Sequence, residues 1–296
     1  MQKLIVFNSL ESTAMLDQLV YLNGVMTPIS EAKVSVLDRG FIFGDGIYEA
    51  VPVYQRKPFR AEQHLARLFR SLDSIRIPNP HSKEEWLRLI DQMIASHPAD
   101  DQLVYLQITR GVAKRAHAFP QQVTPTVFMM TNPIVLPSAD AHANGVACVS
   151  LEDRRWLRCE IKSTSLLGNV LAAQNAVEND AVESIQFRDG FLTEASASNV
   201  WIVKHGKLIG PPKNNLILEG IRYGLIEELC TAASIPLESR RITREEVFDA
   251  DEVLLTSASK EVLPVASLDG KPIGNGKPGP IYKQLYAAYQ AAKAAA

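Results

Sequence analysis

The 296-residue sequence has few cysteines, few aromatic residues and almost no net charge. Its three cysteines, Cys148, Cys159 and Cys230, are odd in number and widely spaced. This excludes a disulfide framework or a paired-cysteine metal site and favours a reducing, cytoplasmic location. Basic and acidic residues nearly balance, 31 against 33, for a formal charge of −2. A general nucleic-acid-binding protein usually has a basic face or tail, so we expect no nucleic-acid partner.

Long hydrophobic runs are absent as well. No run approaches the ~20 apolar residues of a membrane-spanning helix, so no membrane association is expected. Residues Met1–Ser9 contain only a short apolar stretch, Leu4–Phe7. A signal-peptide core needs ~7–15 apolar residues, so no signal peptide is predicted.

Motifs for metals and nucleotides are also missing. The sequence has no phosphate-loop Gly-Lys-Ser/Thr, no His-Glu-x-x-His and no Cys-x-x-Cys, and its six histidines are scattered. We therefore predict no metal site. The segment Gly274–Gly279 fits the dinucleotide string Gly-x-Gly-x-x-Gly, but too little chain follows it for a strand–helix–strand unit. We interpret it as a loop before the last helix.

The composition that remains is that of an ordinary globular protein, 46% hydrophobic and 22% charged. The length is about twice the ~150 residues typical of one domain, which predicts two domains. Residues 132–145 contain two prolines, no clear periodicity and a closing glycine, all features of a linker. We expect a smaller N-terminal domain over 1–135, a linker over 136–144 and a larger C-terminal domain over 145–296.

Strand and helix signals are mixed along the chain. Asn23-Gly24 between two β-forming runs predicts a hairpin, and the alternation over Trp156–Lys162 predicts a strand. Ser82 with Glu85, and Thr243 with Glu246, have the spacing of capping boxes. Further strands are expected over 47–54, 103–109, 126–131, 146–151, 199–204, 252–256 and 262–265, and helices over 62–75, 83–94, 166–177, 221–229 and 281–293. Apolar residues mark one face of the helix over 166–177: Leu166, Leu167, Val170, Leu171 and Val177.

Four segments contain motifs that indicate a catalytic function: Arg39–Glu49, Arg110–His117, Arg154–Lys162 and Thr193–Val200. In order and spacing they resemble the pyridoxal-phosphate-dependent aminotransferases of fold type IV, collinearly from about Val20 to the final helix. The Arg-x-His element resembles in particular the members of this family that act on D-amino acids. The other segments are shared with branched-chain aminotransferases and aminodeoxychorismate lyase.

The resemblance implies a mixed α+β fold of two domains. The smaller N-terminal domain would be an α/β sandwich, and the larger C-terminal domain a pseudo-barrel that binds the cofactor, pyridoxal 5′-phosphate. It also implies a homodimer in which Arg115 and His117 reach the active site of the neighbouring subunit. Because the assigned residues fall on both sides of the predicted linker, we expect the site to lie in the crevice between the domains.

The resemblance assigns three residues to the reacting part of the cofactor. Lys162 would be the Schiff-base lysine, Glu194 the carboxylate that pairs with the pyridine nitrogen, and Leu218 a side chain that packs against one ring face. A lysine has this role only when its neutral form is accessible. On local sequence alone, the alternatives are a surface lysine at a strand end, a solvated glutamate on a hairpin and an ordinary core leucine.

The resemblance assigns five residues to the cofactor phosphate. Arg67 would bind it with its planar guanidinium, Ile221 and Arg222 from a helix N-terminus, and Ser257 and Ala258 from the turn after a strand. Arg222 stands where relatives usually have a small hydroxyl residue, and Ala258 where they often have threonine. Side-chain hydroxyl bonds are lost at both positions while backbone donors remain. The alternative for Arg67 is a residue on the polar face of a helix.

The substrate side of the resemblance is carried by Tyr48, Arg115 and His117, which would bind the substrate α-carboxylate. An arginine and a histidine two residues apart in an extended loop point the same way, and with a tyrosine hydroxyl they offer several donors to one carboxylate. The alternative is an exposed basic loop.

The resulting prediction is transamination of D-amino acids, such as D-alanine or D-glutamate, with a 2-oxo acid acceptor by a ping-pong mechanism. The small-molecule partners would be the amino acid and the keto acid. Alternatives on the same fold are an L-branched-chain or (R)-amine transaminase and aminodeoxychorismate lyase. An alternative of another class is a non-catalytic binding protein.

Overall fold

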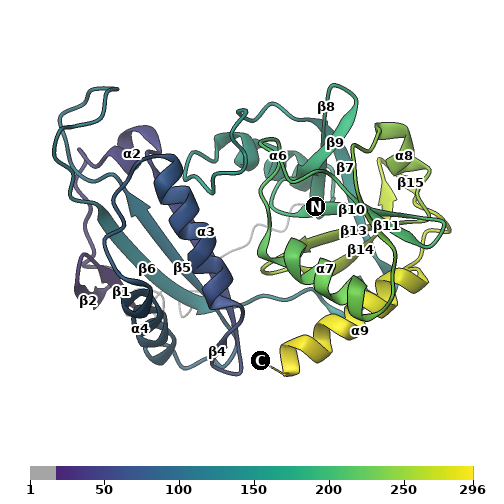
Figure 1. Cartoon of the computed structure of the whole chain (residues 1–296), viewed down its shortest axis with the longest axis horizontal. Helices are drawn as coiled ribbons and strands as arrows, with labels where there is room; N and C mark the ends of the chain where they lie inside the picture. The colour runs from purple at the N-terminus through teal and green to yellow at the C-terminus, as the bar shows by residue number, and fades with distance from the viewer. Residues whose placement is uncertain (1–17, 296) are drawn as a thin grey trace. The chain divides into compact units, whose positions relative to one another are not determined.

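The computed structural model describes residues 18–295, so the expectations for Met1–Ser9 and for the start of the chain lie outside the described residues. The chain divides into two compact units (Figure 1). The first unit runs to Ile134 and also includes Ser163–Ser165; the second comprises Val135–Lys162 and Leu166 onward. The segment predicted as a linker holds a short helix, α5 (Ala139–Asn144), and its N-cap Ser138 accepts a hydrogen bond from Ala141 N.

The first unit is built on a six-stranded antiparallel sheet with the order β2-β1-β6-β5-β3-β4. Its Asn-Gly hairpin is confirmed, since Asn23 and Gly24 both have positive φ, 48° and 97°. The strands are β1 (Leu19–Leu22), β2 (Val25–Pro28), β3 (Gly46–Tyr54), β4 (Lys57–Pro58), β5 (Gln102–Thr109) and β6 (Thr126–Pro133).

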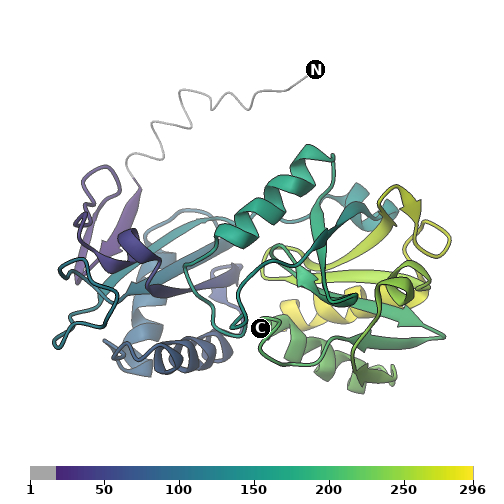
Figure 2. The same cartoon turned by 90° about the horizontal axis from the view of Figure 1, so that it is seen from above.

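Helices α3 (Ala61–Ser74) and α4 (Lys83–Ala95) pack against the sheet of the first unit, α3 on β3 and α4 on β5 and β6 (Figure 2). Strand β3 accordingly buries Ile47, Glu49 and Val51 on one face, with period two. Ser82 caps α4 as predicted, because its hydroxyl accepts from Glu85 N. The short helix α2 (Arg39–Phe43) precedes β3.

The second unit has a nine-stranded mixed sheet with the order β12-β11-β10-β13-β14-β7-β8-β9, and β15 paired to β14. Its core is a single cluster of apolar side chains from these strands. The strands are β7 (Val146–Glu152), β8 (Glu183–Arg188), β9 (Phe191–Ala195), β10 (Asn199–Lys204), β11 (Lys207–Gly210), β12 (Leu237–Ser239), β13 (Glu252–Ser257), β14 (Glu261–Leu268) and β15 (Lys271–Pro272).

Besides α5, the second unit contains the helices α6, α7, α8 and α9. Helix α8 (Arg244–Phe248) begins with the predicted capping box of Thr243 and Glu246. Helices α7 (Ile221–Ala232) and α9 (Pro280–Ala294) pack on each other and on β13, and α9 also packs on β14. Helix α6 (Leu167–Glu178) contacts β7 and β8.

The strand predicted over Trp156–Lys162 is wrong, because this segment forms turns. Its backbone bonds locally and to a distant loop: Ile161 N donates to Arg158 O, and Cys159 N donates to Asn215 O. Of the three residues on the apolar side of the alternation, Cys159 and Ile161 are buried but Leu157 is exposed. The face predicted for α6 is also solvent-exposed, with Leu167, Val170, Leu171 and Val177 between 58% and 72% accessible.

Candidate active site

In the first unit, the predicted phosphate ligand Arg67 lies on α3 and is buried against β3. Its guanidinium forms a two-point ion pair with Glu49, Nε to Oε1 at 2.7 Å and Nη2 to Oε2 at 2.8 Å. His64 Nδ1 lies 2.7 Å from Glu49 Oε2. Burial by itself would raise the pKa of Glu49, but the charge and hydrogen bonds of Arg67, with His64, hold it well below its usual range.

The chain around Lys162 is fixed by bonds to the start of β3. Ser163, the next residue, forms a β-bridge with Ile47, and Thr164 N donates to Gly46 O at 3.0 Å. The side chain of Lys162 is half-buried. The backbone after the predicted reactive lysine is therefore anchored on one side by a regular strand.

Tyr48 follows Ile47 and lies on the face of β3 opposite Glu49, since side chains alternate along a strand. Its ring stacks on Tyr105 of the neighbouring strand, with centroids 5.6 Å apart. Burial raises the pKa of Tyr105 to about 12. Tyr48 is only half-buried, as a side chain that receives a ligand would be.

Arg115 and His117 lie in the irregular segment between β5 and β6 and are exposed. Both contact the ring of Phe43, at the end of α2. The Arg115 guanidinium carbon lies 5.5 Å from the ring centroid, and the His117 ring centroid also lies 5.5 Å away. The predicted arginine–histidine pair is therefore gathered around one aromatic side chain.

In the second unit, Glu194 on β9 is buried and held from several sides. Its Oε1 accepts from Arg155, and its Oε2 accepts from Leu218 N at 3.0 Å and from Asn199 Nδ2 at 3.3 Å. Burial raises the pKa of Glu194, and the Arg155 guanidinium opposes that shift. Arg155 is itself fixed by Asp153, with Nη2 to Oδ2 at 2.8 Å.

Asn199 joins three of the predicted cofactor elements. Besides Glu194, its Nδ2 donates to Leu218 O at 2.8 Å, and its Oδ1 accepts from Gly220 N at 3.2 Å. Gly220 is the N-cap of α7 and has no side-chain cap, so the first turn that begins with Ile221 keeps the positive end of a helix dipole. A Cβ on Gly220 would lie 2.3 Å from Asn199 Oδ1, so only glycine fits this close approach.

The remaining predicted phosphate residues lie near these elements. Asn199 pairs with Thr256 in the β10–β13 ladder, which puts the following Ser257 and Ala258 at the same end of the sheet as Asn199. Ser257 Oγ accepts from Lys260 N at 3.0 Å. The buried Arg222 side chain donates from Nε to Tyr289 Oη at 3.1 Å, so its guanidinium is engaged with α9.

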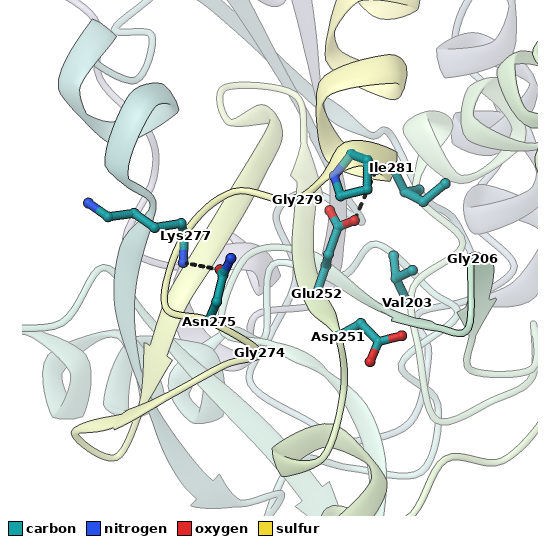
Figure 3. A pocket seen from close by; sticks show the side chains of 10 residues that line it. Val203, Gly206, Asp251, Glu252, Gly274, Asn275, Lys277, Gly279 and Ile281 are labelled. Carbon is teal, nitrogen blue, oxygen red and sulfur yellow. Dashed lines mark hydrogen bonds between the residues drawn. The ribbon is translucent and has the colours of Figure 1, made fainter.

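A cavity of the second unit lies elsewhere, at the start of α9 (Figure 3). Glu252 lines it and caps the helix, accepting from Ile281 N and Tyr282 N. Gly274 and Gly279, from the segment that fits the dinucleotide string Gly-x-Gly-x-x-Gly, also line it. None of the predicted cofactor residues lines this cavity.

Comparison with known proteins decides the family. The model of the class IV amino-transferases matches residues 46–268 of this chain. The chain belongs to this family. The resemblance inferred from the four segments is thereby confirmed, and the chain is an aminotransferase enzyme.

Similar members of the class IV family cover nearly the whole chain. The D-alanine aminotransferase of Staphylococcus aureus (strain MSSA476) is 43% identical over 272 residues, 92% of this chain and 96% of that protein. The D-alanine aminotransferase of Bacillus licheniformis is 40% identical over 271 residues, 92% and 95% of the two chains. The branched-chain amino acid aminotransferase of Escherichia coli superposes with a TM-score of 0.88 at 24% identity, over 93% of this chain and 94% of that one. This likeness confirms the α+β fold type.

Three residues that organise the candidate site have no role predicted from the sequence. Glu49, Arg155 and Asn199 hold Arg67, Glu194 and the start of α7, respectively. Glu49 is the last residue of one recognised segment, and Arg155 and Asn199 lie inside two others, but only their buried pairing reveals the role. Within residues 18–295, no helix is long and apolar enough to cross a membrane, and no cluster of metal-ligating side chains occurs.

Proposed function

We propose that this aminotransferase is pyridoxal-phosphate-dependent and transfers the amino group of D-amino acids to a 2-oxo acid. The observation that carries the D-specific assignment is the convergence of Arg115 and His117 on Phe43. The 43% identity of the chain to a D-alanine aminotransferase supports the same assignment. An arginine fork with a neighbouring histidine suits an α-carboxylate. Tyr48 would supply the third donor.

The residues present fit the proposed cofactor. Arg67 is a buried guanidinium preorganised by Glu49, and such a fork matches a phosphate. The uncapped first turn of α7 at Ile221, with Ser257, suits the same anion. Because Ala258 lacks a hydroxyl and Arg222 is bonded to Tyr289, their share of phosphate binding would come from backbone N–H groups.

Glu194 fits the other end of the cofactor. Its carboxylate is buried and oriented by Arg155, as a partner for a ring N–H must be. When bound, pyridoxal phosphate withdraws electrons from the substrate α-carbon and stores the amino group between the two half-reactions. Leu218, fixed through its backbone to Glu194, would pack on the ring.

Lys162 would hold the cofactor and move the proton at the substrate α-carbon. Because the backbone is anchored through Ser163, the range of positions of the Lys162 amine is limited. This suits proton transfer on one face of the substrate α-carbon. The carboxylate donors then decide which α-hydrogen faces this amine, so the D preference is a matter of geometry.

We also propose that the enzyme is a homodimer, with Arg115 and His117 serving the neighbouring site. Both residues are exposed in one copy. Apolar side chains that a single copy leaves exposed support a second copy as the occupant, among them Phe41 at 74% and Leu167 at 72%. Val170 and Leu171 of α6 extend the apolar surface beside Leu167.

One experiment separates the substrate classes. The cofactor-loaded enzyme is mixed in turn with D-alanine, L-alanine, L-leucine and an amine without a carboxylate, and the loss of the aldehyde-form absorbance is followed. We expect conversion with D-alanine and little with the others. Conversion by L-leucine alone would assign the enzyme to the branched-chain type, and conversion by the amine alone to the amine type.

A further inference from the structure

Three consecutive carbonyl groups of the loop that carries Arg115 and His117 converge on one guanidinium. Arg39 Nη1 donates to Ala116 O at 2.5 Å and, more weakly, to Ala118 O at 3.4 Å, and its Nη2 donates to His117 O at 3.2 Å. Arg39 is only 3% exposed. These bonds fix the backbone at His117 and at Ala116, the residue that follows Arg115.

The Arg39 side chain is in turn held in place by an acid. Its Nε donates to Asp45 Oδ2 at 2.7 Å, and Arg110 donates to the same carboxylate, Nε to Oδ2 at 2.8 Å and Nη2 to Oδ1 at 3.0 Å. The Arg39 guanidinium carbon also lies 4.9 Å from the centroid of the Phe43 ring. The Phe43 ring thus contacts Arg39 and also both Arg115 and His117.

The loop needs such an anchor because it has no regular hydrogen bonding of its own. Residues 113–125 form neither helix nor strand. Backbone carbonyls in such a segment must find side-chain or water partners, and a loop bonded only to water moves freely. A second fixed point is Phe119, whose ring lies 3.6 Å from the Arg110 guanidinium carbon. Arg115 and His117 lie just before that point.

We propose that Arg39 is a positioning residue that sets the geometry of Arg115 and His117 for the substrate α-carboxylate. This inference rests on the proposed function of that pair. Arg39 acts through the loop backbone and touches no substrate. An arginine is required because its planar fork serves Asp45 and several carbonyls at once, whereas a lysine ammonium has three donors on a single atom.

The test compares Arg39→Lys with a matched control, Arg56→Lys. Arg56 also donates to three carbonyls of the first unit, those of Ile94, His97 and Ala99, but none of them belongs to a predicted site residue. Two readouts are taken on the cofactor-loaded full-length enzymes. One is hydrogen–deuterium exchange of the peptide over 112–125, and the other is the dependence of the half-reaction rate on D-alanine concentration.

For Arg39→Lys we expect the loop amides to exchange at least about fivefold faster. The half-saturating D-alanine concentration should rise about tenfold, with the maximal rate within about threefold of wild type and cofactor affinity unchanged. Arg56→Lys should change neither readout. Unchanged loop exchange in Arg39→Lys would overturn the inference, and so would a looser loop with unchanged half-saturation.

The two failures are distinguishable. If wild-type enzyme does not convert with D-alanine, the proposed D-specificity fails, while loop exchange still reports whether Arg39 fixes the loop. The concentration dependence is then measured with the amino acid that does convert the enzyme. A half-saturation unchanged by Arg39→Lys with that amino acid overturns the positioning role, and a rise of about tenfold retains it for that substrate.

Discussion

Glu49 and Arg67 face each other across the interface between β3 and α3 as a buried two-point ion pair, 0% and 5% exposed. The acid leaves the arginine one orientation, and that orientation is available before any ligand arrives. A planar fork fixed in this way loses little conformational entropy when it binds a phosphate.

Replacing Glu49 by glutamine should weaken cofactor binding. The amide keeps the shape but lacks the charge and the second acceptor oxygen, so Arg67 loses its fixed orientation. We expect the dissociation constant for pyridoxal phosphate to rise about tenfold or more, as read by absorbance titration. The control is Glu62→Gln on α3, the helix of Arg67. Glu62 forms an exposed ion pair with Lys83, with an N–O distance of 3.0 Å. Equal affinities in both variants would contradict the role of Glu49.

The same pair predicts an acid dependence of stability. The pKa of Glu49 is lower in the folded state than in the unfolded chain, so its contribution is present above the unfolded value of about 4.3 and is lost as pH falls below it. Urea unfolding from pH 6 to about pH 3 should show stability declining with falling pH. The decline should be shallower in Glu49→Gln. Asp45, whose pKa is also lowered, would sustain part of the slope in that variant.

Gly220→Ala should damage the phosphate end of the site. The added Cβ would meet Asn199 Oδ1 at 2.3 Å and displace the amide that links Glu194 to the start of α7. We expect cofactor affinity to fall about tenfold or more. Gly224→Ala on the same helix is the control, since nothing lies within 4 Å of its added Cβ. That variant should keep its affinity and gain up to about 1 kcal/mol of stability. An equal loss in both variants would point to general helix perturbation.

Arg155→Met should leave Glu194 buried without its counter-charge. The pKa of Glu194, already raised, should rise further, so the carboxyl would be neutral over a wider pH range. We expect the D-alanine half-reaction to slow by about two orders of magnitude at neutral pH and to recover partly as pH rises. Arg158→Met, which breaks an exposed pair with Glu160, should have little effect. A variant with a pH-independent rate would contradict this account.

Lys162→Ala and Arg115→Ala should each inactivate the enzyme yet complement each other if it forms the proposed homodimer. In a heterodimer, one site has Lys162 from one chain and Arg115 from the other, and the second site lacks both. Co-expression with two tags allows the mixed dimer to be isolated, and its activity should be about half of the wild-type value. An inactive mixed dimer would mean that Arg115 serves the site of its own subunit.

How far the sequence predicts this molecule depends on the range of the interactions. Hairpins and caps were predictable because their signals are local: Asn23-Gly24 adopts positive φ, and Thr243 caps α8. The strand prediction over Trp156–Lys162 is wrong because Cys159 N donates to Asn215 O, far away in the chain. Local periodicity contains no information about such a partner.

The candidate site follows the same rule. Lys162, Glu194 and Arg67 could be proposed from the family resemblance that four segments indicate. Their supports could not, because Arg155 and Asn199 acquire their roles only when folding brings distant residues together. The exposure of the apolar side chains on α6 could not be predicted, since an apolar stripe looks the same in the sequence whether it packs within one chain or against another.

The short excursion of Ser163–Ser165 into the first unit has a consequence for anyone who would divide this protein. The chain crosses the boundary after Ile134, and then twice more within four residues of Lys162. A fragment starting at Val135 would contain the proposed Schiff-base lysine but not the β3 backbone that its next residues bond to. The two units are therefore poor candidates for exchange between relatives as independent modules, and recombination would have to carry β3 and the Lys162 segment together.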